Sequence, residues 1–483
     1  MKLNRLLENV EVLKTNVDMN MEITSVVYDS RKVTPGCLFV AITGFATDGN
    51  RYIPMALEKG AVAVVTAKQP EENVPYILVS SDRLALAQIG DNFYDHPSQS
   101  LKLIGITGTN GKTSSTLLLK HVLEQVLDAK VGLMGTMHNM IGNQILPTER
   151  TTPESFELQA LLAQMRDAGC TYAIMEVSSH AIALERVGGL HYEAAAFTNL
   201  TEDHLDFHKT MENYCDTKAL LFSRCNKAVG NLDDSWFDRL CGNAKCDLLT
   251  VSAKQNADLY AKEEKLLSDG VQFVAVRGEE QVLVKLPIPG KFTVYNALTV
   301  LGIALQLGIT LSDAAKALET AQGVKGRVEV VPTPGKPYTV LIDYAHTPDG
   351  LENVLSSVKG FCKGRLIAVF GCGGDRDPIK RPIMGRIGAE IADLAIITSD
   401  NPRTEEPGAI IEDIVKGIDP DRKNYEVIEN RVQAIHHALD IGEKNDIIVL
   451  AGKGHETYQE IQGVKHHLDE REVVSAYLEK MRK

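Results

Sequence analysis

A glycine-rich segment that ends in lysine and threonine has the clearest chemistry in the sequence. Residues 105–114 read Gly-Ile-Thr-Gly-Thr-Asn-Gly-Lys-Thr-Ser and lie between an apolar run and a helical pattern. Small residues let backbone amides turn toward phosphate oxygens, and the following helix adds its positive end. The lysine reaches the terminal phosphates, and the threonine hydroxyl can coordinate magnesium. The segment therefore predicts an ATP-binding phosphate loop made of Gly108, Thr109, Asn110, Gly111, Lys112, Thr113 and Ser114.

The spacing of this segment departs from the general P-loop pattern. That pattern has a glycine six residues before the lysine, where this sequence has Ile106. A tight strand-to-helix turn without a ligand is the alternative interpretation, but Lys112 and Thr113 in register favour phosphate binding. We therefore predict a phosphate loop and leave its subclass open.

Acidic and histidine-rich segments follow two further apolar runs. Glu176 ends one run, where the acidic partner of a phosphate loop usually holds magnesium, although a purely structural salt bridge is the alternative. Segment 198–208 follows the next run and contains two histidines and three acids. This density favours His204 as a magnesium ligand or phosphate contact over an ordinary surface histidine. Thr113, Glu176 and His204 are thus predicted metal ligands.

The elements around these residues alternate between strands and helices. Strand-like apolar runs at 101–107, 172–177 and 194–198 lie between helical patterns such as 113–127 and 154–168. This alternation predicts a parallel sheet covered on both faces, with ligands at the carboxyl ends of its strands.

The same alternation restarts after a break near 323–329. Four strand-like runs, at 339–343, 366–370, 394–399 and 447–451, are each followed by a polar or glycine-rich cluster. They predict a Rossmann-like, doubly wound domain with its ligand site at those clusters.

The amino-terminal hundred residues give a smaller α/β unit. It has apolar runs at 37–42 and 61–66, a helical pattern at 81–94, and a linker-like segment after it. We therefore predict three α/β domains: a small amino-terminal domain (1–98), a central P-loop ATPase with a mainly parallel sheet (99–327) and a doubly wound carboxyl-terminal domain (328–483).

Composition limits the partners. The 51 basic and 64 acidic residues give a formal charge of −13, which opposes binding to nucleic acid or to an anionic membrane surface. The sequence has no signal-like stretch and no apolar run long enough to insert into a membrane. We expect a cytoplasmic protein with small-molecule substrates. The sequence does not give the oligomeric state, for which our expectation is a monomer.

Several long motifs carry a resemblance to a known family. In order, they read Thr-Gly-Thr-Asn-Gly-Lys-Thr, Glu-Val-Ser-Ser-His, Asn-Leu-Thr-Glu-Asp-His-Leu-Asp-Phe-His, Asp-Tyr-Ala-His-Thr-Pro-Asp and Gly-Lys-Gly-His-Glu. Together with Asp29-Ser30-Arg31 and Pro35-Gly36, they resemble the Mur ligases of peptidoglycan synthesis over nearly the whole chain. The resemblance implies an amino-terminal domain for the UDP end of the precursor, a central ATPase and a carboxyl-terminal domain that delivers an amino acid.

The resemblance also implies roles for residues that spacing alone does not single out. The family lysine in the context of 214–222 is carbamylated by CO2, and the matched Lys218 would become an anionic magnesium ligand, catalytic together with Lys112 and His204. Taken singly, each remaining position would be interpreted as an ordinary cap or a solvated residue, and only the resemblance gives it a role. The implied nucleotide contacts are Asn296, Arg327 and Asp343, and the implied UDP-precursor contacts are Ser30, Thr151, Thr152, Ser178 and Arg186.

The tetrapeptide Asp400-Asn401-Pro402-Arg403 resembles the signature of family members that add meso-diaminopimelate. This amino acid differs from lysine by a distal carboxylate, which a guanidinium binds through two parallel hydrogen bonds. A proline turn with a solvated arginine is the alternative interpretation. The resemblance implies that the diaminopimelate-binding residues are Arg376, Asp400, Asn401, Pro402, Arg403, Gly452 and Glu456, with Arg403 as the specificity residue.

The implied reaction is ATP-dependent amide formation. The D-glutamate carboxylate of UDP-N-acetylmuramoyl-L-alanyl-D-glutamate attacks the γ-phosphate, and the amine of meso-diaminopimelate displaces phosphate from the acyl phosphate. Alternatives within the enzymes are a lysine-adding ligase, which Arg403 disfavours, and a folylpolyglutamate-type ligase, which the amino-terminal domain disfavours. A nucleotide-dependent switch that hydrolyses ATP without ligating anything is the alternative from another class.

Overall fold

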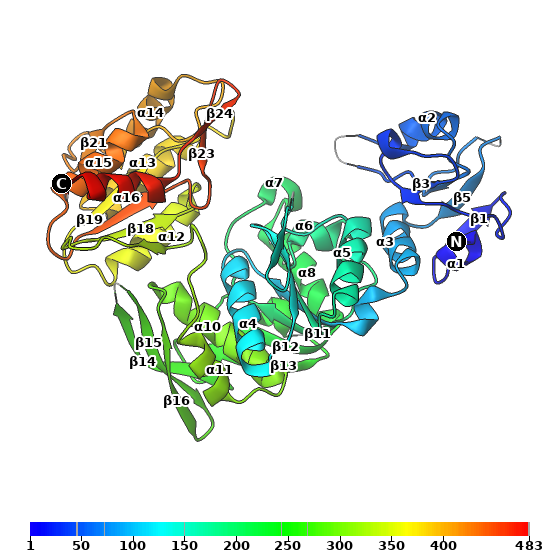
Figure 1. Ribbon diagram of the computed structural model, residues 1–483, viewed down its shortest axis with the longest axis horizontal. Helices are drawn as coiled ribbons and strands as arrows, with labels where there is room; N and C mark the ends of the chain where they lie inside the picture. The colour runs from blue at the N-terminus through cyan, green and yellow to red at the C-terminus, as the bar shows by residue number, and fades with distance from the viewer. Residues whose placement is uncertain (45–46, 72, 149, 243, 268, 482–483) are drawn as a thin grey trace. The chain divides into compact units, whose positions relative to one another are not determined.

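The computed structural model describes residues 1–44, 47–71, 73–148, 150–242, 244–267 and 269–481 (Figure 1). The chain divides into two compact units, the first made of Met1–Leu259 and Thr299–Ala314 and the second of Tyr260–Leu298 and Ala315–Lys483. The amino-terminal segment falls in the first unit, whereas the predicted central segment (99–327) is divided between the two units. The boundaries near 98 and 327 therefore stay predictions.

The amino-terminal part of the first unit is a five-stranded sheet with the order β1-β5-β4-β3-β2. Only β1 runs antiparallel to its neighbour. The helix predicted at 81–94 is confirmed as α3, which begins where the Ser81 hydroxyl accepts a hydrogen bond from the amide of Leu84. The bounds are α1 Leu3–Leu6, β1 Val12–Thr15, β2 Val26–Val27, β3 Leu38–Val40, α2 Ile53–Glu58, β4 Ala63–Thr66, β5 Tyr76–Val79 and α3 Asp82–Phe93.

The larger sheet of the first unit contains the strands predicted around the phosphate loop. Strand order runs β13-β12-β11-β6-β10-β7-β8-β9, and the first six strands are parallel. The central strand β6 is buried at every position after Lys102, so its polar surroundings begin only where it ends. The antiparallel edge pair β8 and β9 was not predicted. The strands are β6 Lys102–Thr107, β7 Val131–Met134, β8 Asn139–Ile141, β9 Gln144–Leu146, β10 Tyr172–Glu176, β11 Tyr192–Phe197, β12 Cys225–Asn231 and β13 Asp247–Ser252.

Helices connect these strands as the sequence predicts. The patterns at 113–127 and 154–168 are confirmed as α4 and α5. The remaining helices of this part are short, and α8 carries Lys218. The bounds are α4 Lys112–Leu127, α5 Ser155–Asp167, α6 Ser179–Ala183, α7 Leu205–His208, α8 Met211–Ala219 and α9 Phe237–Cys241.

The second unit contains a six-stranded sheet with the order β17-β18-β22-β19-β20-β21, in which only β17 is antiparallel. Residues from α12, α13 and α14 share one apolar core with this sheet, and residues from α15 and α16 share a second core with its other face. Figure 1 shows α15 and α16 side by side. The predicted doubly wound fold is therefore confirmed. The bounds are β17 Glu329–Val331, β18 Thr339–Asp343, α12 Pro348–Lys359, β19 Leu366–Phe370, α13 Lys380–Ile391, β20 Leu394–Ile397, α14 Pro407–Val415, β21 Tyr425–Val427, α15 Arg431–Ile441, β22 Ile447–Ala451 and α16 Glu470–Met481.

Two further antiparallel pieces of the chain were not predicted. One is the meander in which β15 pairs with β14 and β16, and the other is the hairpin of β23 and β24. Within the described ranges, no helix combines the length and the apolar character that crossing a bilayer requires. The remaining bounds are β14 Leu259–Leu267, β15 Gly270–Arg277, β16 Glu280–Leu286, α10 Lys291–Gln306, α11 Leu311–Leu318, β23 Tyr458–Ile461 and β24 Val464–His467.

Candidate active site

The phosphate loop connects β6 to α4 and depends on two glycines. Gly108 has φ +145° and Gly111 has φ +86°, both in the region that strains residues with a side chain. A Cβ atom on Gly108 would overlap the Thr198 hydroxyl and lie 2.9 Å from the carbonyl oxygen of Asn199. The glycine that the general spacing lacks is therefore replaced by one that lets the loop approach the end of β11.

The loop after β11 holds the phosphate loop in this shape. The amide of Thr109 donates to the Asn199 carbonyl at 2.8 Å, and the amide of Asn110 donates to Asn199 Oδ1 at 2.9 Å. The Thr198 hydroxyl donates to the Asn110 carbonyl at 2.6 Å. Because Asn199 binds these two amides, a phosphate would meet the loop beyond Asn110, at the positive end of α4 where Thr113 and Ser114 begin the helix.

Two lysines converge on the carbonyls of the phosphate loop. Lys112 Nζ donates to the carbonyls of Gly108 and Thr109, each at 2.8 Å. Lys218 Nζ donates to the Gly108 carbonyl at 3.1 Å, and its residue is only 1% exposed. Burial, and then the nearby charge of Lys112, hold the pKa of Lys218 well below its ordinary value. A neutral amine is the form that reacts with CO2, so the site has the chemistry that a carbamate needs.

Glu176 lies at the end of β10, beside the start of the phosphate loop. It is 1% exposed, and its two carboxylate oxygens accept hydrogen bonds from the amide and the hydroxyl of Thr136, each at 2.9 Å. Within the part of the chain that the structure describes, no ion pair to Glu176 is present, so the salt-bridge interpretation has no partner. The sequence analysis missed Thr136, although it follows the short apolar strand β7, as ligand-contacting residues often do.

His204 lies in the loop between β11 and α7, with φ +55°. Its ring stands edge-on to the ring of His180 with centroids 4.7 Å apart, and its Nε2 lies 3.3 Å from a carboxylate oxygen of Asp203. Burial, with Lys112 and Lys218 nearby, lowers the pKa of His204. The neutral imidazole, which is the form that ligates metals, is therefore favoured.

The predicted magnesium ligands form a partial donor set. Among the described residues, no three His, Cys, Asp or Glu side chains converge as a closed metal cage. Magnesium in nucleotide sites usually takes one or two carboxylates and completes its shell with phosphates and water. The hydroxyl of Thr113, the carboxylate of Glu176 and a carbamate at Lys218 are oxygen donors of that kind, so the residues fit the ion when a nucleotide brings the phosphates.

Four residues predicted to hold the UDP-precursor gather beside Glu176. The Thr152 hydroxyl donates to the backbone carbonyl of Glu176 at 2.7 Å and lies 3.3 Å from Ser178 Oγ. The Thr151 hydroxyl lies 3.1 Å from the hydroxyl of Thr136. Arg186 Nη1 donates to the Thr152 carbonyl at 3.4 Å. Side chains that are far apart in sequence thus meet at the carboxyl end of β10.

Glu154, which was not among the predicted site residues, lies next to these four residues and contacts several arginines. Glu154 is nearly buried, and its Oε2 lies 3.2 Å from Arg186, 3.7 Å from Arg83 and 3.8 Å from Arg150. Ser30 lies apart, in a short helical turn of the amino-terminal sheet, where its carbonyl accepts a hydrogen bond from Lys59. No described contact joins Ser30 to Thr152 or Ser178, and its role stays a prediction.

Nucleotide contacts predicted in the second unit are buried or already bonded. Both carboxylate oxygens of Asp343 accept backbone amides, from Val328 and Ala345, each at 2.8 Å. Burial raises the pKa of Asp343. The Arg327 guanidinium lies 5.2 Å from the ring centroid of Tyr344, and Asn296 is buried on α10. Asp343 therefore shapes the loop after β18, and any nucleotide contact would share its oxygens.

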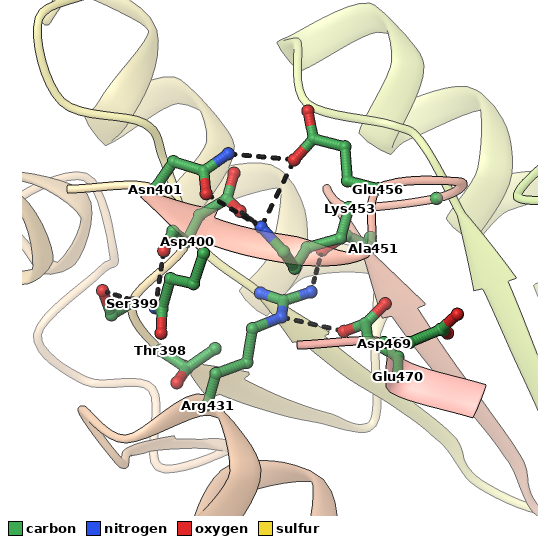
Figure 2. Close-up of polar contacts among 12 residues, drawn as sticks. Thr398, Ser399, Asp400, Asn401, Arg431, Ala451, Lys453, Glu456, Asp469 and Glu470 are labelled. Atoms are coloured by element: carbon green, nitrogen blue, oxygen red, sulfur yellow. Dashed lines mark hydrogen bonds and ion pairs between the residues drawn. The ribbon is translucent and has the colours of Figure 1, made fainter. Parts of the chain in front are cut away.

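Asp400, Asn401 and Glu456, three of the predicted diaminopimelate residues, meet at the carboxyl ends of β20 and β22 (Figure 2). Asn401 Nδ2 donates to Glu456 Oε2 at 2.9 Å. Lys453, which the sequence analysis did not select, lies between them and also contacts Asp400. Gly452 has φ +114°, and a Cβ atom there would lie 3.5 Å from Asp400 Oδ2. Three of the predicted residues thus form one cluster.

Arg403 lies at the edge of this cluster in a strained backbone conformation. Its φ is +51°, which is uncommon for a residue with a side chain. Arg403 Nη1 donates to the Gly374 carbonyl at 2.8 Å, and its Nε lies 3.4 Å from the Glu460 carboxylate. The guanidinium is therefore fixed and only 21% exposed, which removes the solvated-arginine interpretation. Arg376 is exposed and bonds only the carbonyl of Asp375 in the described chain.

The chain matches protein-family models over most of its length. Three family models match consecutive segments: Mur ligase family, catalytic domain, over 22–94; Mur ligase middle domain over 106–304; and Mur ligase, glutamate ligase domain, over 326–454. The chain belongs to the Mur ligase family. The matched segments follow the order of the three domains that the sequence predicts, and the predicted fold class is confirmed.

Similar proteins share the whole length of the chain. The curated "UDP-N-acetylmuramoyl-L-alanyl-D-glutamate--2,6-diaminopimelate ligase" of Clostridium botulinum is 47% identical over 489 residues and covers 100% of both chains. The protein of the same name from Listeria monocytogenes is 42% identical over 492 residues, covering 99% of each. A solved structure of a ligase of this name has 32% identity and a TM-score of 0.76, over 100% of this chain and 99% of that one.

The fold is shared with more distant enzymes. A folylpolyglutamate synthase from Thermotoga maritima has 20% identity and a TM-score of 0.59, over 76% of this chain and 90% of that one. At this identity the likeness shows the fold alone.

Gly108→Ala should weaken ATP binding by tenfold or more, because the added Cβ would push the loop away from Thr198 and Asn199. Gly169→Ala is the matched control, since Gly169 has φ +79° but no atom within 4 Å of its Cβ position. The control keeps its affinity and loses only about 1–2 kcal/mol of stability from backbone strain. Titration calorimetry with a non-hydrolysable ATP analogue measures both, and equal affinities for the two variants would contradict the collision.

Proposed function

We propose that the chain is an ATP-dependent ligase that adds 2,6-diaminopimelate to UDP-N-acetylmuramoyl-L-alanyl-D-glutamate and releases ADP and phosphate. Full-length relatives of that name support the assignment. The structural observation that supports this function is the pair of Asn401 and Glu456, together with the fixed guanidinium of Arg403. The Glu456 carboxylate offers an acceptor for an ammonium group and the Arg403 guanidinium a donor fork for a carboxylate, as a zwitterionic amino acid requires.

Residues of the first unit activate the acceptor carboxylate. A D-glutamate oxygen forms a bond to the γ-phosphorus while the bond from that phosphorus to the bridging oxygen breaks, and ADP leaves. Lys112 stabilises the charge that develops on the phosphate oxygens. Magnesium, when bound, supplies further positive charge that offsets the repulsion between carboxylate and triphosphate. Thr113, Glu176, His204 and the Lys218 carbamate hold it in this proposal.

The amino acid completes the reaction. Its amine, after losing a proton, attacks the acyl carbon, and inorganic phosphate leaves with the electrons of the broken carbon–oxygen bond. Thr151, Thr152, Ser178 and Arg186 bind the muramoyl-dipeptide portion, and Ser30 binds the uridine end. Asn296, Arg327 and Asp343 complete the nucleotide site. These assignments rest on the family resemblance and on the contacts around Glu176.

We also propose a carbamate on Lys218. The support is geometric: the amine is buried and lies against the Gly108 carbonyl, and its hydrogen-bond partners among the described residues include no carboxylate. Addition of CO2 to the neutral amine forms a nitrogen–carbon bond and releases one proton. It replaces a cation beside the phosphates with an anion that can ligate magnesium. We further propose a monomer in the cytoplasm, in keeping with the acidic net charge and the small-molecule substrates.

The purified chain should form ADP only when both the UDP-dipeptide and 2,6-diaminopimelate are present. An ADP-release assay over a panel of amino acids, with mass spectrometry of the product, tests this. Preference for lysine would assign a lysine-adding ligase, and glutamate transfer to a folate would assign the folylpolyglutamate type. ADP formation without acceptor or amino acid would instead support a nucleotide-dependent switch.

Arg403→Ala should raise the KM for 2,6-diaminopimelate by roughly one to two decades, because a lost charged hydrogen bond costs about 1.5–3 kcal/mol. The KM values for ATP and for the UDP-dipeptide stay within twofold. Arg376→Ala is a control for general loss of positive charge, and its effect is smaller since Arg376 is exposed. Steady-state kinetics with each substrate varied in turn makes the comparison. An unchanged diaminopimelate KM in Arg403→Ala would remove the specificity role.

Lys218→Ala should lose nearly all activity, and added formate or acetate should restore part of it by placing a carboxylate where the carbamate belongs. Lys120→Ala is the matched control, because Lys120 is also buried but bonds Glu124 instead. That variant needs no rescue and gains nothing from the acids. Carbon-13 NMR after equilibration with labelled bicarbonate detects the carbamate directly. Normal activity in Lys218→Ala, together with no carbamate signal in the wild type, would refute the role.

A further inference from the structure

Lys453 is a fully buried cation that none of the roles proposed above includes. It is 0% exposed and lies between Gly452 and Gly454, which have φ +114° and +53°. These two residues aim the lysine from the end of β22 into the sheet edge rather than toward solvent. An isolated ammonium in such a place is costly, so its partners explain why it is there.

The Lys453 partners are three of the residues proposed to bind the amino acid (Figure 2). Nζ donates to Asn401 Oδ1 at 3.0 Å and lies 3.2 Å from Asp400 Oδ1 and 3.3 Å from Glu456 Oε2. The lysine therefore ties the loop after β20 to the loop after β22. In the described chain its ammonium is surrounded by these oxygens and by the ring of Tyr458 at 5.8 Å.

These contacts settle which way the Asn401 amide faces. Asn401 Oδ1 accepts from Lys453 and from the amide of Glu460, so Nδ2 must be the group that donates to Glu456. Glu456 in turn receives a hydrogen bond from both Asn401 and Lys453 on the same Oε2 atom. One cation thus orients the amide and the carboxylate together.

The cluster around Lys453 has a net negative charge. Asp400 and Glu456 contribute two negative charges and Lys453 one positive charge, so the cluster is negative by one. It can still attract an ammonium group, whereas without Lys453 the two largely buried carboxylates that share its ammonium would lose that compensating charge. Lys453 therefore lets two carboxylates stand together without removing the attraction for a cationic substrate.

We propose that Lys453 is a positioning residue for amino-acid binding, which fixes the Asn401 amide and with it the Glu456 carboxylate that receives the ammonium group of the incoming substrate. This inference rests on the proposed ligase function. It requires no contact between Lys453 and the substrate, because the lysine acts through the two side chains that it fixes.

Lys453→Met keeps most of the side-chain volume and removes the charge. We expect the KM for 2,6-diaminopimelate to rise at least tenfold, while the KM values for ATP and the UDP-dipeptide change by less than twofold. If Lys453 acts through Asn401, the double variant Lys453→Met/Asn401→Ala loses much less than the sum of the single losses. Strictly additive losses, or an unchanged diaminopimelate KM, would overturn the proposal.

Arg431→Met is the matched control for loss of a buried cation. Arg431 is equally buried, but it bonds Glu470 at 2.8 Å and the Ala451 carbonyl at 2.7 Å and contacts none of Asp400, Asn401 and Glu456 (Figure 2). It should unfold at a lower temperature without a selective change in diaminopimelate KM. The same selective change in both variants would show a general disturbance and count against Lys453.

Two further measurements separate the possible failures. If wild-type protein forms no product with any amino acid, the ligase function itself is wrong, whatever Lys453 does. If Lys453→Met does not fold, Lys453→Gln retains a donor for the Asn401 oxygen and should show an intermediate diaminopimelate KM. Failure of both variants to fold would make Lys453 a stability residue and overturn its positioning role.

Discussion

Burial of the parallel strands on both faces is the constraint on which the rest of the structure depends. Strands such as β6, β10, β19 and β22 are apolar over nearly their whole length, because helices or neighbouring loops cover each side of the sheet. Polar side chains can therefore appear only where a strand ends. All the carboxyl ends of parallel strands lie at one edge, so residues far apart in sequence must meet there.

Each unit has a buried lysine at the edge where its parallel strands end, Lys218 in the first and Lys453 in the second. The two lysines have different surroundings. Lys218 is bonded to a carbonyl and a hydroxyl oxygen, so its charge is poorly compensated and burial lowers its pKa. Lys453 has two carboxylates and an amide oxygen within 3.3 Å. The first arrangement favours a reactive neutral amine, whereas the second pairs the lysine with acceptors whose positions it organises. In our proposals the same residue type thus takes part in the chemistry in one unit and positions other residues in the other unit.

The sequence predicts the parallel strands and their helices well because length and apolar continuity define them, as at β10 and β18. It misses the antiparallel pieces, since short alternating segments such as β23 have a weak signal. Thr136 and Glu154 could not be chosen for the site, because each becomes informative only through partners from other loops. Lys453 lies within a family motif, yet only its burial shows that it is not a solvated lysine. Proximity and burial are properties of the fold, and local sequence does not contain them.

The hairpin of β23 and β24, which sequence patterns miss, also holds Arg403, the residue that we propose sets the specificity. Arg403 has a left-handed backbone, which costs about 1–2 kcal/mol for a residue with a side chain. Its amide donates to the Glu460 carbonyl at 3.0 Å, and its own carbonyl accepts from Gln462, so the turn between β23 and β24 stabilises the conformation. The Glu460 carboxylate then meets the guanidinium from the same strand. Because the fold fixes both the backbone and the guanidinium before any substrate arrives, a distal carboxylate that binds Arg403 need not order a flexible side chain. Discrimination between a diamino diacid and lysine can then come from one charged contact.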